Sequence, residues 1–204
     1  MTGNDAKSGL LRALKRERLH VERGALEASP PEVRRSFEHA WAPADLLLAR
    51  MSGWPAGLVS FWLQAPAGHI IFCCEASIYL PLGLPWYGEH LRGVARVSLA
   101  DLLGDGRPAL EVVAHLVDHL LGSRGEPDGL WLSDGAGVTP RLEEVGRRVQ
   151  SLARLGYGPN ETRRYFAWAF AGYWLNRRGL NAADPNVERL LRTTLCSEAF
   201  WRRS

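Results

Sequence analysis

Two histidines four residues apart, His115 and His119, have the spacing in this chain that best fits a defined chemistry. They lie in the segment 111–122, EVVAHLVDHLLG, where the polar side chains share one stripe of a predicted helix and the other positions are apolar. Two imidazoles one helical turn apart can direct ring nitrogens at one divalent ion, as in zinc peptidases. The sequence therefore predicts a buried helix that carries a candidate zinc site.

A zinc hydrolase also needs a carboxylate that accepts a proton from metal-bound water. The usual pattern places a glutamate directly after the first histidine, and here that position is Leu116. Asp118 is an alternative catalytic base, because H-x-x-D-H is close to the inverted pattern H-x-x-E-H. An aspartate is one methylene shorter than the glutamate of that pattern. Asp118 could therefore equally orient one of the metal-binding histidines through a hydrogen bond, without acting on the water. The sequence leaves both roles open.

A third zinc ligand is not evident near the histidines. A histidine three residues beyond Gly122 would complete a common zincin pattern, but Gly125 stands there, and Gly122 is predicted to end the helix. Four side chains elsewhere are candidates for the third ligand: Asp134, Glu161, Glu111 and His90. The alternative is that both histidines are ordinary residues of a partly exposed helix face, although that stripe, unlike most other predicted helices, has no arginine.

Hydrophobic periodicity and turn residues predict the elements that position these side chains. Residues 10–26 have the charged amphipathic pattern of an exposed helix, and residues 32–41 form a helix with Ser29 as its N-cap. The apolar runs of residues 57–97, broken by proline and glycine, predict a small sheet of three or four strands. Three more helices are predicted, over residues 140–155, 159–176 and 186–200.

Composition bounds the class of protein. The 204 residues are 46% hydrophobic and include eight tryptophans, which indicates one main folded domain. The net charge of +3 is interleaved with carboxylates along the chain, which argues against a nucleic-acid partner. There is no apolar stretch of about 18 residues and no apolar core of a secretory signal. The three cysteines form no disulfide framework, so we expect a cytoplasmic protein without a membrane segment.

The segment 160–185, NETRRYFAWAFAGYWLNRRGLNAADP, carries a second pattern. Its F-A-x-x-F-x-x-Y core, taken with the histidine helix, resembles the anthrax lethal-factor-like and Pro-Pro endopeptidase group of zincins, which are zinc metallopeptidases. In that group the second active-site helix reads F-A-E-x-F, and its glutamate is the third zinc ligand. Trp168 stands at that position in this chain. Aromatic residues at helical spacing also predict ordinary core packing.

The resemblance implies an α+β protein with a zincin-like core, made of a small mixed sheet, a buried histidine-bearing helix and a helical C-terminal part. We expect residues 51–204 to form this zincin-like domain and residues 1–50 to form a helical extension packed on it. Because Leu116 and Trp168 replace the two glutamates, the resemblance implies an eroded catalytic set, inactive or weakly active. Such a protein could still bind an extended peptide or protein partner along residues 93–99, as zincins pair substrate with an edge strand.

Two other functions stay open at this stage. One is an active zinc hydrolase in which His115 and His119 bind zinc, Asp118 is the base, and one of the acidic or imidazole candidates completes the site. The other is a helical interaction module without a metal, whose N-terminal arm, residues 7–23, binds a partner or nucleic acid.

Overall fold

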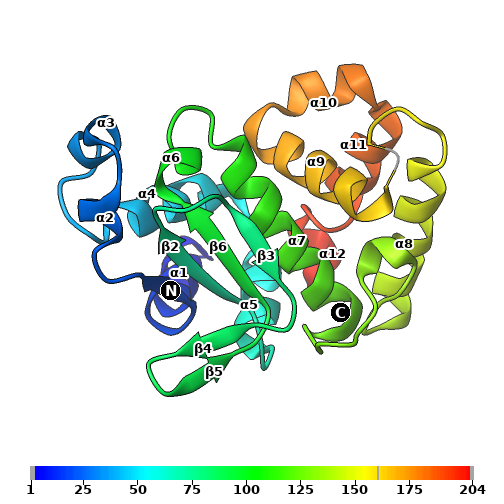
Figure 1. The fold of residues 1–204 in the computed structure, drawn as a ribbon. Coiled ribbons are helices and arrows are strands. Elements are labelled where there is room, and N and C mark those ends of the chain that lie inside the picture. Colours follow the sequence, from blue (N-terminus) through cyan, green and yellow to red (C-terminus); the bar gives the residue numbers. More distant parts are fainter. Residues whose placement is uncertain (1–2, 160, 203–204) are drawn as a thin grey trace.

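The structure, a computed structural model, describes residues 3–159 and 161–202. Its centre is a four-stranded mixed sheet with the strand order β1-β2-β6-β3 (Figure 1). Strands β1 (Leu19–Val21), β2 (His69–Cys73) and β6 (Val94–Ser98) run parallel, and β3 (Ile78–Leu80) is antiparallel to β6 at the edge. A hairpin of β4 (Leu84–Trp86) and β5 (Glu89–Leu91) projects from one end of the sheet.

Helices make up most of the remaining chain, and the prediction of an α+β protein with a small mixed sheet is confirmed. Short 3-10 helices lie at Met51–Gly53 (η1) and Leu132–Asp134 (η2). The α-helices, in chain order, are α1 (Gly3–Arg18), α2 (Ala25–Ala28), α3 (Pro31–Arg35), α4 (Ala42–Arg50), α5 (Ala56–Gln64), α6 (Leu99–Leu102), α7 (Arg107–Ser123), α8 (Pro140–Ala153), α9 (Thr162–Leu175), α10 (Arg177–Ala183), α11 (Pro185–Thr193) and α12 (Glu198–Trp201).

The two faces of the sheet bury different cores, because successive side chains of a strand point to opposite faces. One face joins the main core together with buried side chains of α1, α5 and α7, through Ile70, Phe72, Ala95 and Val97. On the other face Ile71 and Val94 pack with Leu91 of the hairpin in a smaller core. The histidine helix therefore lies on the main-core side of the sheet.

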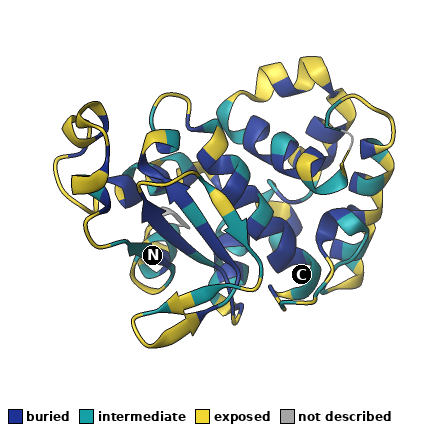
Figure 2. Cartoon of the chain, in the orientation of Figure 1, coloured by how far each residue is buried: buried dark blue, intermediate teal, exposed yellow. Residues whose placement is uncertain are grey.

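Helix α7 confirms the predicted buried helix and extends along the sheet to pack against α9 (Figure 1). It begins after Gly106, whose φ of 67° turns the chain, and Pro108 lies in its first turn. Figure 2 shows α7 buried over most of its length. Helix α9 likewise buries Phe166 and Phe170, which confirms core packing for the aromatic segment.

The predicted end of α7 at Gly122 is wrong, because the helix continues to Ser123 and Arg124 follows it in a left-handed conformation. A Cβ on Gly122 would lie 2.3 Å from the Leu130 carbonyl oxygen and 2.5 Å from the Trp131 carbonyl carbon. Gly122 is thus the point at which the following loop crosses the helix. This crossing places Trp131 over the histidines.

Several predicted elements of the N-terminal half are also wrong. Residues 56–64 form a helix instead of a strand, since a short apolar run fits a buried segment of either type. The strand at 94–98 is interior, paired on both sides, so it offers no open edge to a peptide. Ser29 does not cap α3, since its hydroxyl donates to the Ala25 carbonyl instead.

Residues 1–50 contain helices and also supply strand β1 of the central sheet. The amphipathic pattern of residues 10–26 is interrupted after Arg18, where residues 19–21 become β1 by pairing with β2. Leu14 and Leu19 are fully buried. Residues 7–23, the arm of the interaction-module hypothesis, thus contribute β1 and two buried leucines to the folded core. At the other end, the predicted helix 186–200 is divided into α11 and α12.

Candidate functional site

The polar stripe of α7 faces the loop between α7 and α8, which covers it. Asp118 and His119 are fully buried, and His115 is half-buried. Glu111 lies at the more open end, where it pairs with Arg107 at 3.4 Å. The stripe therefore does carry a polar site, but most of it is closed off from solvent.

His119 is hydrogen-bonded at both ring nitrogens. Its Nε2 lies 2.8 Å from the Glu126 carbonyl oxygen, and its Nδ1 lies 2.6 Å from the Tyr79 hydroxyl. A carbonyl oxygen can only accept, so Nε2 carries the proton and Tyr79 donates to Nδ1. Burial lowers the pKa of His119, in agreement with this neutral tautomer. In this arrangement neither nitrogen has a free lone pair for a metal.

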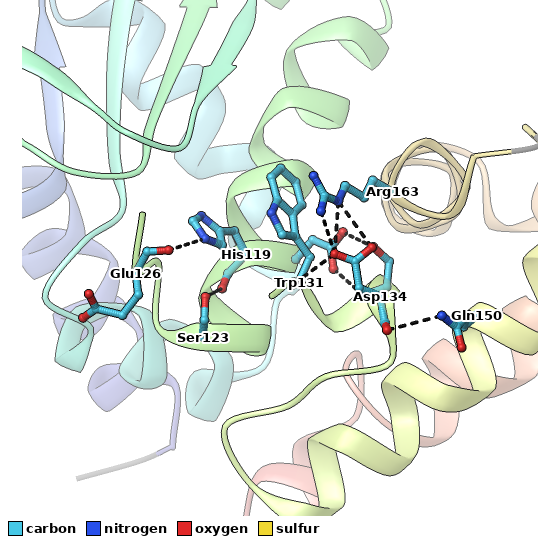
Figure 3. Close-up of polar contacts among 9 residues, drawn as sticks. His119, Ser123, Glu126, Trp131, Asp134, Gln150 and Arg163 are labelled. Atoms are coloured by element: carbon cyan, nitrogen blue, oxygen red, sulfur yellow. Dashed lines mark hydrogen bonds and ion pairs between the residues drawn. The ribbon is translucent and has the colours of Figure 1, made fainter. Parts of the chain in front are cut away.

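The indole of Trp131 contacts both histidine rings. It stacks on His119 with ring centres 5.0 Å apart and meets His115 edge-on at 5.9 Å. The guanidinium of Arg163 from α9 lies 4.3 Å from the Trp131 ring centre and pairs with Asp134 at 2.7 Å (Figure 3). A packed layer of an imidazole, an indole and a guanidinium therefore fills the place beside the histidines.

Asp118 anchors the turn that carries Trp131. Its two carboxylate oxygens accept the Ser133 N–H at 2.8 Å and the Ser133 hydroxyl at 2.7 Å. Burial raises the pKa of Asp118 from 3.8 to about 7, against the opposing effect of the Ser133 hydrogen bonds. The side chain thus points at η2 and serves there as a buried acceptor.

His115 faces a cavity of about 390 Å3 beside the edge strand β3. Its Nδ1 is buried and has no hydrogen-bond partner among the described residues. Burial lowers the pKa of His115, Arg163 and Arg164 act in the same direction, and Glu161 acts in the opposite one. The walls of the cavity include Ile78, Tyr79, Trp131, Glu161, Arg163 and Arg164. This cavity is the open part of the site.

The candidate third ligands do not converge on the two histidines. Asp134 is paired with Arg163, and Glu111 with Arg107. The His90 Nε2 is bonded to the Leu82 carbonyl at the hairpin, and Glu161 alone shares the cavity with His115. Over residues 3–159 and 161–202, no three His, Cys, Asp or Glu side chains are grouped to hold a metal ion. The side chains as placed do not fit a zinc centre, and zinc binding stays a prediction.

Trp168, at the position of the zincin glutamate, is half-buried and packs against Tyr165 with ring centres 5.8 Å apart. The Tyr165 hydroxyl donates to Asp184 at 2.6 Å, and Asp184 also accepts the N–H groups of Asn186 and Val187 at the start of α11. This part of α9 therefore joins the helices of the C-terminal region to one another.

Sequence reasoning missed Tyr79, Trp131, Ser133 and Arg163 as parts of the site. The run Leu130-Trp131-Leu132 followed by Ser-Asp-Gly was a visible signal of a turn with a buried anchor. Its partners come from β3, α7 and α9, which the spacing of residues along the chain does not bring together.

No protein-family model and no curated protein matches this sequence, so the zincin resemblance rests on the residues given above. In the described part of the chain, no helix is long and apolar enough to cross a membrane.

Proposed function

We propose that this protein is a zincin relative with an eroded catalytic set that binds an extended peptide along the open edge of β3. The fold supports the family part of the proposal, because a mixed sheet, a buried histidine helix and an aromatic helix occur in the expected order. The hydrogen bonds of the site support the loss of the catalytic set. Both ring nitrogens of His119 are bonded, to Tyr79 and to the Glu126 carbonyl, and Asp118 is bonded to Ser133.

The observation that carries the peptide proposal is the direction of the Tyr79 backbone. The Ser98 N–H donates to the Ser77 hydroxyl at 2.9 Å, so the backbone groups of Ser98 and, by alternation, Arg96 face β3. The register pairs Arg96 with Ile78, so Ile78 bonds to β6. The N–H and C=O of Tyr79 then face the other side, where the described residues place no further strand.

An added strand would lie directly over the His115 cavity. Backbone hydrogen bonds to Tyr79 would give sequence-independent affinity, and the cavity would receive a side chain of the peptide. Ile78 lines the cavity and is 49% exposed, so its side chain is accessible to an added peptide. Binding of this kind needs no metal and no catalytic base.

Selection from a random peptide library displayed on phage, against the full chain, tests this function. Ile78→Asp places a charge at the cavity and should abolish binding of the selected peptides. Leu82→Asp is the matched control, because Leu82 is 63% exposed but does not line the cavity. Failure to enrich any peptide, or equal loss in both variants, would contradict the proposal.

Elemental analysis of the purified protein separates the eroded site from an active zinc hydrolase. We expect no stoichiometric zinc after purification with zinc present, and no change in thermal stability on adding a chelator. One zinc ion per chain, lost in the His115→Ala and His119→Ala double variant, would instead establish a metal centre and overturn the eroded-site interpretation.

A further inference from the structure

The positive charge of the chain is concentrated in its C-terminal third. Residues 140–204 contain twelve arginines and six carboxylate side chains, a net charge of +6, whereas residues 1–139 have a net charge of −3. The described part of this third forms α8 to α12, of which α8 to α11 lie together on one side of the sheet (Figure 1) and α12 packs against α5. The excess of positive charge in this part of the sequence therefore also lies in one region of the fold.

A groove of about 460 Å3 runs between α8 and α11 in this region. Each helix contributes residues at positions i, i+3, i+4 and i+7, so the groove follows two turns of both helices, roughly 11 Å of their length. Its walls are Glu144, Arg147, Arg148, Ser151 and Leu152 from α8, and Asn186, Arg189, Leu190 and Thr193 from α11.

The rim of the groove is cationic. Arg147 pairs with Glu143 at 2.8 Å and with Glu144 at 3.0 Å, and Arg148 pairs with Glu144 at 2.8 Å. Arg189 faces the groove from the other helix and forms no ion pair among the described residues. Three guanidinium groups thus line the groove with one carboxylate, that of Glu144. The Arg189 guanidinium has no hydrogen-bond or ion-pair partner among the described residues, so all its N–H groups are free to donate.

More arginines lie on the side of α11 that faces α10. A second hollow of about 680 Å3 is lined by Arg177, Arg178 and Arg192 around a single carboxylate, Glu188. Arg177 and Arg192 pair with Glu188 at 2.6 and 3.4 Å. The excess of positive charge therefore extends over α10 and α11.

The floor of the α8–α11 groove is apolar. Leu152 and Leu190 line it, one from each helix. An apolar floor with a cationic rim is complementary to a helix that has leucine-like residues on one face and carboxylates beside them.

We propose that the α8–α11 groove binds a short amphipathic, acidic helix of a partner protein. The apolar face of that helix packs on Leu152 and Leu190, and its carboxylates accept hydrogen bonds from Arg189, Arg147 and Arg148. A nucleic acid fits less well, because the carboxylate of Glu144 would face its phosphates and the apolar floor would be unused. This surface is separate from β3, so the inference does not depend on the peptide function.

Fluorescence polarisation with synthetic peptides tests the inference. The probe is a labelled 14-residue peptide with leucines at helical i, i+3, i+4 spacing and glutamates at most other positions. Controls are a scrambled peptide of identical composition, the same helix with lysine in place of glutamate, and a labelled single-stranded oligonucleotide. We expect the acidic amphipathic peptide to bind most tightly, and its affinity to fall when salt is raised.

Two charge reversals provide the matched variants. Arg189→Glu should weaken binding of the acidic peptide by about tenfold or more, because a groove charge is inverted. Arg12→Glu makes the same change on an exposed position of α1 and should leave binding unchanged. The Leu152→Asn variant should weaken binding at every salt concentration. Circular dichroism establishes that each variant is folded. Absence of binding, equal binding of the scrambled peptide, tighter binding of the oligonucleotide, or no effect of Arg189→Glu would overturn the proposal.

Discussion

Replacement of Asp118 distinguishes a buried structural acceptor from a catalytic base. Asp118→Ala leaves the Ser133 N–H and hydroxyl without their acceptor in a fully buried position. An unsatisfied buried donor costs about 1–3 kcal/mol, so the alanine variant should lose about 3–5 kcal/mol of unfolding free energy. Asp118→Asn keeps an oxygen for the Ser133 N–H, and its amide can donate to the Ser133 hydroxyl. It should lose less than about 1 kcal/mol at neutral pH.

The pH dependence follows from the raised pKa of Asp118, which is about 7 in the folded chain against 3.8 for an unperturbed aspartate. Between these values the folded state holds a proton that the unfolded state releases, so unfolding free energy falls as pH rises. From pH 5 to pH 7 the loss is about 2 kcal/mol, and about 0.4 kcal/mol more is lost by pH 8. Asp118→Asn has no titrating carboxyl and should not show this loss.

Urea unfolding followed by tryptophan fluorescence, at pH 5 and pH 8, measures these differences in wild type and both variants. Wild type should gain stability relative to Asp118→Asn at pH 5 and lose that advantage at pH 8. Two results would refute the assignment of Asp118 as a buried acceptor. One is an equal loss of unfolding free energy in the alanine and asparagine variants. The other is a difference in unfolding free energy between wild type and Asp118→Asn that does not change with pH.

Three further substitutions test the packing of the site. Gly122→Ala should cost more than about 2 kcal/mol, because its Cβ meets the Leu130 backbone, whereas Gly9→Ala in open space should stabilise by up to about 1 kcal/mol in the same urea titration. His119→Ala leaves the Tyr79 hydroxyl and the Glu126 carbonyl without their hydrogen-bond partner, so it should lower the unfolding free energy by about 2–4 kcal/mol. Equal stability of wild type and variant would contradict the assigned hydrogen bonds. Asp184→Ala, which uncaps α11 and orphans Tyr165, should lower the melting temperature measured by calorimetry, and an unchanged value would contradict the capping role.

The sequence was sufficient for the features that depend on local pattern. The buried stripe of α7 follows from apolar residues at helical spacing, and the boundaries of α8 and α9 are close to those predicted from the same signal. The apolar run of residues 56–64 is too short for periodicity to distinguish a helix from a strand, which is why the strand prediction fails there.

The site itself depends on contacts between distant segments. Spacing alone placed His115 and His119 on one face, but it gave no sign that Tyr79 and the Glu126 carbonyl would take both nitrogens of His119. Likewise, the role of Asp118 depends on Ser133, which approaches only because Gly122 lets the loop cross α7. Such long-range partners are fixed by tertiary packing and leave no periodic signal in the chain.

Amide hydrogen exchange at Tyr79 tests the proposed peptide edge most directly. In the free protein the Tyr79 amide should exchange faster than those of Ile78 and Leu80, because only the latter two face β6. Addition of a selected peptide should slow exchange at Tyr79 and leave Ile78 and Leu80 protected as before. A Tyr79 amide already protected in the free protein, or one whose exchange is unchanged when the peptide is bound, would contradict peptide binding along β3.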